Sequence, residues 1–424
     1  MASFLIRNMG LCIREKLKTF RPHVMMDDPT PDTASSPTRS GHRWLSFRLR
    51  TMLIGMTVAC VLLGGIGRYY VRMLQQEAVA ESIANLGGRA FYEYQFVRTR
   101  ELLLEDPPGP SWLRGLFGEN LFATLHSVEV SARTGEEERA VEAIHLLEQL
   151  PDLQTLDLVK VPLGRSEVEV LVALPKLRQL TISDCPISDE NWQRLMASRS
   201  LETVSLSYKD LHPAKIASLR SLPSLRELEI WTHRNDPASV EAIFRELQTL
   251  QQLKSLTLRT IPIGNKQMVV IAQLKELRSL DIQWEVQSRF DDEGFAELES
   301  LRHLTHIKLP LARIGGASME VVARMPSVET LEIPGSFIED DDMVHLAGHP
   351  SLKRLDICQT RITDDGLQHL KSAPQLCELG VLPDWGVAVT MDGLQDAGFI
   401  EYDSRVTLQS RWFERTPPAA KTSK

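Results

Sequence analysis

A motif of three apolar residues with the spacing L-x-x-L-x-L recurs along most of this chain and constrains its fold more than any other feature. With valine and isoleucine allowed, ten intervals of equal or nearly equal length separate successive copies: seven of 24 residues, two of 28 and one of 27. Such a regular period predicts an array of similar structural units. The first residues of the copies are Leu125, Leu153, Leu177, Leu201, Leu225, Leu253, Leu277, Leu304, Val328, Leu352 and Leu376.

Each unit predicts one short strand followed by one short helix. In the copy that starts at Leu352, Leu355 and Ile357 alternate as in a strand with one buried face. The Thr-Asp-Asp run at 363–365 offers a helix cap and carboxylates near the positive end of the helix dipole, and Leu367 lies on the apolar side of that helix. Neither element can bury its apolar face alone, so the units are expected to stack into one continuous core.

In period and spacing the chain resembles the leucine-rich repeat proteins, whose repeats are about 20 to 29 residues long. This resemblance implies an α/β fold: a leucine-rich repeat solenoid with a parallel sheet on its concave face. The NLGGRAFYEYQF and PSWLRGLFG stretches, together with a basic tail, one apolar stretch and ITDDGL-type repeats, are similar to bacterial single-pass membrane-anchored leucine-rich repeat proteins. The fold class implies binding of a protein or peptide partner, because such solenoids present a large concave surface.

One position departs from the usual leucine-rich repeat pattern. The residue eight places after each first leucine is commonly Asn or Cys in that family, whereas here its identity varies, from Val161 and Cys185 to Lys209 and Thr360. Regular hydrogen bonding in the turns is therefore in doubt. The helix positions keep the repeat better, with apolar residues at Val168, Trp192, Ile216, Met268, Met319, Met343 and Leu367.

Residues 51–71 predict a transmembrane helix. Seventeen residues from Thr51 pass without a charge, aromatic residues flank them, and four arginines precede the stretch against two that follow closely. The positive-inside rule then places the N-terminus in the cytoplasm and the repeats outside, in a bacterial-type cell membrane. A cleaved signal peptide is the competing interpretation, but its basic region would be about 50 residues long, and the small-x-small site at 78–80 lies far past the apolar run.

The chain is thus expected to have five segments. Before the repeats, the segment with Trp112 should cover the first open end of the core, with the Trp112 side chain packed against it. The segments are a disordered basic cytoplasmic tail (1–50), a transmembrane helix (51–71), a helical linker and N-terminal cap (72–124), the repeats (125–382), and a C-terminal cap with a disordered tail (383–424).

The charge distribution argues against nucleic acid as a partner. Residues 1–50 carry nine Lys or Arg against four acids, and Arg68 and Arg72 add two positive charges, so the total of −8 leaves −15 for residues 73–424. A nucleic-acid surface needs Lys and Arg to displace counterions. The chain also has no glycine-rich phosphate loop, nucleophile elbow, HExxH or paired-cysteine motif, so we expect neither enzyme activity nor a cofactor.

Two groups of residues have the composition of metal ligands. His345 and His349 are spaced four apart on an expected helix, but no third ligand is evident, and such pairs are more often surface residues. The acidic runs at 291–293, 340–342 and 364–365 all precede a helix. Capping therefore explains them better than calcium binding, and we expect no metal site.

The candidate binding site lies on the strands. The third, fifth and seventh positions of each motif should face the concave side, and the fifth row is mostly acidic. The seventh row brings Trp231 and Arg259 side by side, with Trp284 just beyond. Exposed Trp and Arg are frequent where binding energy concentrates, so the predicted site comprises these three residues with Glu229 and Asp281. The alternatives are that Trp231 and Arg259 only stack on each other, or that the loops of the enlarged units bury them.

A second function also fits the sequence. The arc could be a structural envelope protein that packs against copies of itself without a soluble ligand. Binding of a partner and self-association both use an exposed surface, so the sequence leaves both open.

Overall fold

The computed structural model divides the chain into two units, Met1–Leu63 and Gly64–Lys424. Residues 1–48 of the predicted basic tail and the C-terminal tail from residue 416 lie outside the residues that the structure describes, and so does Trp284. The described residues are 49–95, 107–120, 122–209, 211–232, 236–283, 289–382, 389–401 and 411–415.

Helix α2 (Leu49–Asn85) covers the predicted membrane segment and extends beyond it. In the first unit it exposes apolar side chains such as those of Ile54 and Leu63, whereas in the second unit Met73, Val79 and Ile83 are buried at helical spacing. Among the residues described, however, no helix combines the length and the apolar character needed to cross a membrane. The predicted transmembrane helix at 51–71 is therefore not supported.

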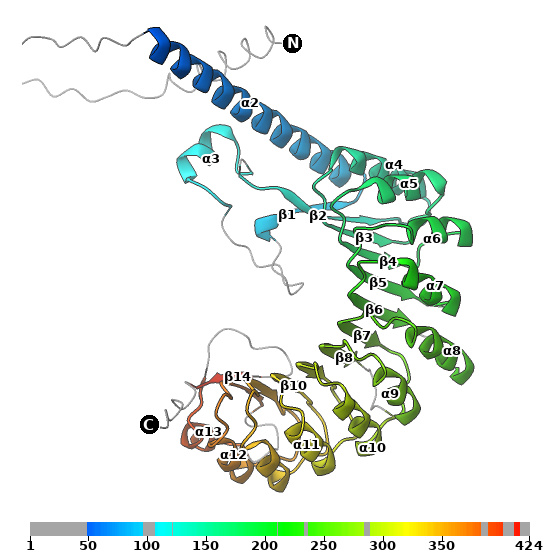
Figure 1. Cartoon of the computed structure of the whole chain (residues 1–424), viewed down its shortest axis with the longest axis vertical. Helices are drawn as coiled ribbons and strands as arrows, with labels where there is room; N and C mark the ends of the chain where they lie inside the picture. The colour runs from blue at the N-terminus through cyan, green and yellow to red at the C-terminus, as the bar shows by residue number, and fades with distance from the viewer. Residues whose placement is uncertain are drawn as a thin grey trace, which may run out of the picture. The chain divides into compact units, whose positions relative to one another are not determined.

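One sheet of 14 strands runs through the second unit (Figure 1). Strands β2 to β12 are parallel and follow one another in sequence order; β1 (Arg89–Tyr92) pairs antiparallel with β2, and β14 (Arg411–Glu414) pairs antiparallel with both β12 and β13 (Ile400–Glu401). The parallel strands are β2 (Leu125–Ser131), β3 (Thr155–Val159), β4 (Gln179–Ser183), β5 (Thr203–Tyr208), β6 (Glu227–Thr232), β7 (Ser255–Arg259), β8 (Ser279–Gln283), β9 (His306–Lys308), β10 (Thr330–Glu332), β11 (Arg354–Asp356) and β12 (Glu378–Val381).

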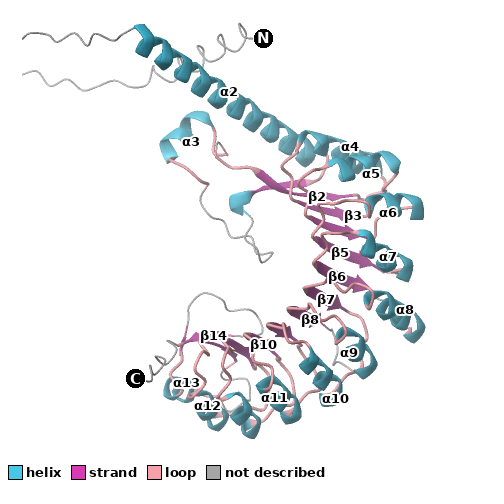
Figure 2. Ribbon diagram, in the orientation of Figure 1, coloured by secondary structure: helices cyan, strands magenta, loops and turns pink. Residues whose placement is uncertain are grey.

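Within the repeats, the strands line the concave side and the helices the outer side (Figure 2). The helices of the repeats are α4 (Glu137–Leu146), η3 (Leu147–Gln149), α5 (Arg165–Ala173), α6 (Asp189–Leu195), α7 (Pro213–Ser218), η4 (Leu219–Ser221), α8 (Pro237–Leu247), α9 (Asn265–Ile271), α10 (Asp292–Ala296), η5 (Glu297–Ser300), α11 (Gly316–Ala323), η6 (Asp340–Leu346), α12 (Asp364–Leu370) and α13 (Met391–Asp396). Two short helices precede them, η2 (Glu93–Gln95) and α3 (Ser111–Phe117).

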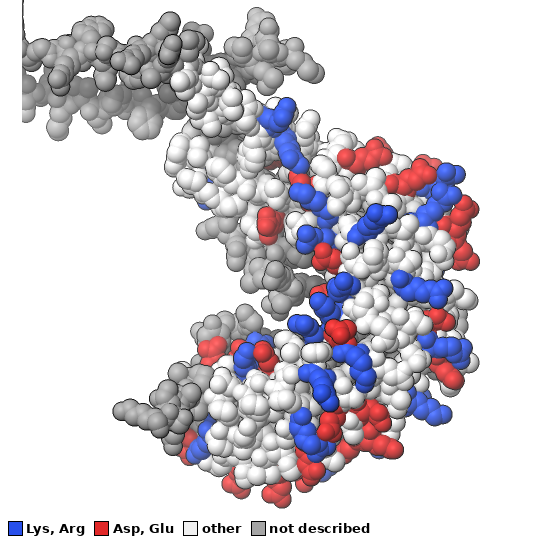
Figure 3. All heavy atoms as spheres, viewed as in Figure 1, with Lys and Arg blue, Asp and Glu red and all other residues white. Residues whose placement is uncertain are grey.

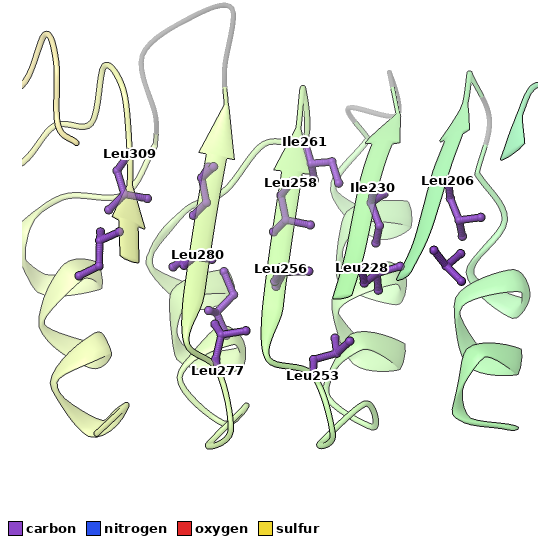
Figure 4. Close-up of a cluster of buried hydrophobic side chains, with 14 of the residues drawn as sticks. Leu206, Leu228, Ile230, Leu253, Leu256, Leu258, Ile261, Leu277, Leu280 and Leu309 are labelled. Atoms are coloured by element: carbon purple, nitrogen blue, oxygen red, sulfur yellow. The ribbon is translucent and has the colours of Figure 1, made fainter. Parts of the chain in front are cut away.

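The apolar motif forms the core between strands and helices (Figure 4). Equivalent leucines stand in register across strand pairs: Leu228 pairs with Leu256, 28 residues on, and Leu280 with Ile307, 27 residues on. The fourth and sixth positions of every motif are at most 2% exposed, and so are the helix-face residues predicted from the repeat. Full burial of one such aliphatic side chain contributes roughly 1.5–3 kcal/mol to folding.

The turns after the strands are more regular than the sequence suggested. Lys160, Asp184, Thr260, Leu311 and Gln359 each lie seven residues after a motif start and have φ between 48 and 58°. The N–H of Lys160 donates to Ser183 O at 2.7 Å, and several equivalent residues likewise bond to the next unit. The doubt about turn bonding was wrong, because backbone groups make these bonds and do not need a conserved side chain.

Carboxylates link the helix starts of consecutive units. Asp340 accepts hydrogen bonds from both N and Oγ1 of Thr363 at 2.6 Å, and Asp364 accepts the same pair from Thr390 at 2.8 and 2.7 Å. Asp292 likewise accepts from Gly315 N in the next unit. Helix capping thus accounts for the acidic runs: these three carboxylates bond to the helix start of the following unit, whereas Asp291 accepts from Glu293 N at the start of its own helix.

The first open end of the core is covered by residues other than Trp112. Val79 and Ile83 of α2 and Tyr92 of β1 join the buried core of the repeats. Trp112, on α3, is instead 66% exposed. The expectation that it packs against the core was wrong, because the apolar face of α2 already covers that end.

Candidate functional site

Three neighbouring strands bring four of the five predicted site residues together. Glu229 and Trp231 occupy alternate positions of β6, so both side chains emerge on the same face of the sheet. Trp231 is the register partner of Arg259 on β7, and Asp281 of β8 lies two strands from Glu229 in the same row. We call these four residues the Trp231 patch.

Trp231 projects into solvent although it lies in the middle of the sheet. It is 44% exposed, and within the described part of strands β2 to β12 it is the one large apolar side chain that is exposed. The loops of the enlarged units that could bury it, 233–235 and 284–288, lie outside the described residues. An exposed indole on an otherwise polar strand surface offers a partner a large, rigid contact.

Arg259 is held by a carboxylate of the neighbouring strand. Its Nε lies 2.8 Å from Glu229 Oε1, and Ser205 Oγ donates to the other oxygen of Glu229 at 3.0 Å. The Arg259–Glu229 contact is an ion pair without hydrogen-bond geometry, because Arg259 Nε has no hydrogen-bond partner among the described residues. The pair is partly exposed, so its contribution to stability is small, at most about 1 kcal/mol.

Asp281 occupies an unfavourable environment. Burial raises the pKa of its carboxyl group, while nearby Lys308, a hydrogen bond from Gln283 Nε2 at 2.7 Å and the charge of Arg259 oppose that rise. Its other oxygen, Oδ1, is buried and has no hydrogen-bond partner among the residues described. A carboxyl group with a perturbed pKa and an unpaired oxygen is typical of functional sites.

The mostly acidic row formed by the fifth position of each motif is less exposed than its place on the concave face predicts. Asp356 is buried, which raises its pKa, and its Oδ1 accepts a hydrogen bond from Cys358 N at 3.0 Å. Lys308 interrupts the row and lies 3.2 Å from Glu332. Burial alone would lower the pKa of Lys308, but Glu332 and Asp281 raise it. The carboxylates of this row are therefore partly buried or paired with neighbouring groups, and they do not form an open acidic surface.

The histidine pair does not form a metal site. His349 is 2% exposed; its Nε2 lies 3.1 Å from Met325 O, and its Nδ1 accepts from Leu352 N at 3.0 Å. Nδ1 thus holds the turn before β11, and Nε2 joins that turn to the preceding unit. Nowhere in the described ranges do three His, Cys, Asp or Glu side chains gather as metal ligands.

A second feature, on the outer side, was missed from the sequence. A cavity of about 430 Å³ lies between α8 and α9 and has three cationic residues in its lining, Arg245, Lys266 and Arg289. These residues come from three consecutive units, so their grouping has no local motif. The available signal was the enlargement of the units that start at Leu225 and Leu277, which flank the cavity.

Among solved structures, the chain is similar to an internalin (InlF) of Listeria monocytogenes at 17% identity, covering 55% of this chain and 74% of that chain, with a TM-score of 0.35. Internalin C2 of the same organism is 18% identical, covers 50% of this chain and 81% of its own, and has a TM-score of 0.31. TLR13 in its complex with ssRNA13 is 16% identical, covers 56% of this chain and 40% of its own, and has a TM-score of 0.38.

The family assignment rests on the sequence itself. No curated protein matches the chain. Residues 141–364 match the family described as a leucine-rich repeat region, which is more than half of the 424 residues. With the stacked strand–helix units and their buried leucines, this match shows that the chain belongs to the leucine-rich repeat proteins.

Proposed function

We propose that the chain binds a protein or peptide partner through the concave face of its repeats, at the Trp231 patch. The observation that carries this proposal is the exposed indole of Trp231, on strands β2 to β12 where no other described large apolar side chain is exposed. Binding energy in protein interfaces concentrates on Trp, Tyr and Arg near the centre of the contact.

The surroundings of Trp231 support the same function. Arg259 is ion-paired with Glu229 at 2.8 Å, so part of its side-chain freedom is already lost before a partner contacts it. The carboxyl group of Asp281, at the edge of the patch, lies in an unfavourable, partly buried environment. A partner that donates a hydrogen bond or brings a positive charge to this carboxyl group would relieve part of its cost.

Affinity capture with the purified full-length chain tests the patch. The variant Trp231→Ala, Arg259→Ala should lose the partner that the unmodified chain retains. A matched control, Trp112→Ala, Arg220→Ala, removes the same residue types at exposed positions outside the patch and should retain it. Equal recovery by both variants would contradict the proposed site, and recovery of the chain alone would favour self-association.

We also propose that the chain is attached to a bacterial-type cell membrane, with its N-terminus in the cytoplasm and the repeats outside. The exposed apolar side chains of α2, such as Ile54, Leu62 and Leu63, and the excess of arginines before them support this proposal. A reporter that is active only outside the cytoplasm, fused after residue 424, should be active in intact cells. An inactive fusion that is nevertheless produced at full length would refute the orientation.

A further inference from the structure

The cavity between α8 and α9 has a buried apolar floor. Successive turns of α8 contribute Val240 and Phe244, both 2% exposed, and the chain before α9 contributes the buried Pro262. Val270 of α9 forms part of the wall. At about 430 Å³ the cavity falls in the range of small-molecule sites, roughly 300–1,000 Å³.

The rim of the cavity is cationic. Arg245, Lys266 and Arg289 line it and are exposed, against a single carboxylate, Glu241. Glu241 Oε1 lies 4.0 Å from Arg245, at the limit of an ion pair, whereas the described residues offer Lys266 and Arg289 no ion pair. Three cations therefore converge above apolar side chains.

This concentration of positive charge runs against the rest of the molecule. Residues 73–424 carry a net charge of −15, and Figure 3 shows Lys, Arg, Asp and Glu side chains interspersed over the repeats. Near the cavity, the lining residues sum to a net charge of +2. A local excess of cations on an acidic protein favours an anion over a cation as the occupant.

Both enlarged units contribute residues to the cavity. The 28-residue unit starting at Leu225 contains α8, which has 11 residues and is the longest helix of the repeats described. Arg289 belongs to the 27-residue unit starting at Leu277, two units further on. Beyond the apolar floor, Gln248 Nε2 donates to Gln273 Oε1 at 2.5 Å and joins α8 to the unit of α9.

We propose that this cavity binds a small amphipathic anion, a carboxylate, sulfonate or phosphate joined to an apolar ring or chain. Its apolar part would rest on Val240, Phe244 and Pro262, and its charged group would meet Arg245 and Lys266 at the rim. Hydrogen bonds between cationic side chains and an anion are about twice as strong as neutral ones. The site lies on the outer face and is independent of the Trp231 patch.

Isothermal titration of the full-length chain with 2-naphthalenesulfonate tests this proposal. We expect saturable binding at one site, and at least about tenfold weaker binding of the neutral analogue 2-naphthalenesulfonamide, a difference of about 1.4 kcal/mol. Arg245→Gln, Lys266→Gln should weaken binding of the sulfonate at least tenfold and leave that of the sulfonamide unchanged. Val270→Trp, which fills the cavity, should weaken both.

The matched control is Arg220→Gln, Lys371→Gln, which removes the same charges from exposed positions elsewhere and should keep the sulfonate affinity within about twofold. Circular dichroism confirms that each variant is folded before titration. Absence of saturable binding to the unmodified chain would overturn the proposal. So would equal sulfonate affinity of the unmodified chain and the Arg245→Gln, Lys266→Gln variant, or an equal loss in the control.

Discussion

The link between consecutive helix starts predicts a strong coupling between Asp364 and Gly393. Asp364 accepts two hydrogen bonds from Thr390, and a Cβ added at Gly393 would overlap the Asp364 carboxylate. Asp364→Ala should lower the free energy of unfolding by about 2–3 kcal/mol, since it removes two hydrogen bonds to a charged acceptor at a partly exposed site. Gly393→Ala should cost about 1–3 kcal/mol, because the carboxylate must leave its position.

The double variant separates this overlap from other effects. With the carboxylate absent, Gly393→Ala should instead stabilise the chain by up to about 1 kcal/mol, because alanine is the better helix former. Urea unfolding followed by circular dichroism measures all four chains, with Gly348→Ala as the control, since a Cβ there meets nothing within 4 Å. Additivity of Asp364→Ala and Gly393→Ala within about 0.5 kcal/mol would refute the proposed contact.

Three further predictions concern the strands and turns. Leu256→Ala should lower the free energy of unfolding by about 2–5 kcal/mol, against less than about 1 kcal/mol for the half-buried Thr257→Ala, as urea unfolding measures. Burial raises the pKa of Asp281 above its unfolded value of 3.8, so this group stabilises the fold best below that value and loses its contribution as pH rises through the folded pKa. Asp281→Asn should therefore stabilise the chain more at pH 7 than at pH 4. An equal effect of the substitution at both pH values would contradict this. Lys160→Gly should raise the melting temperature and Lys160→Val lower it, since φ is 57° there; the opposite order would show that the turn is not strained.

The repeats and their core could be predicted because burial imposes a period on the sequence. Leu228, Leu256 and Leu280 stand in register although 28 and 24 residues separate them, so the motif alone located the strand pairs. The pairing of Trp231 with Arg259 followed from the same register. These predictions required only the knowledge of which positions face the core.

Features that depend on backbone conformation or side-chain direction could not be predicted in this way. The turn position of Lys160 and Thr260 has a positive φ in several units without a shared residue type, because the hydrogen bond to the next unit that recurs there is made by backbone groups. Trp112 was expected to pack against the core, but the sequence around it does not reveal that α2 already covers the first open end of the repeats. The partial burial of Asp281 and the cavity beside Arg289 depend on how neighbouring units pack.

The most direct test of partner binding is photo-crosslinking from position 231 in cells that produce the full-length chain. With p-benzoylphenylalanine in place of Trp231, irradiation should give one discrete adduct with another protein. The matched position is Val269, which is similarly exposed but lies on the outer side, and it should not give that adduct. Absence of an adduct at 231, the same adduct from both positions, or adducts formed only between copies of the chain would contradict binding at the Trp231 patch.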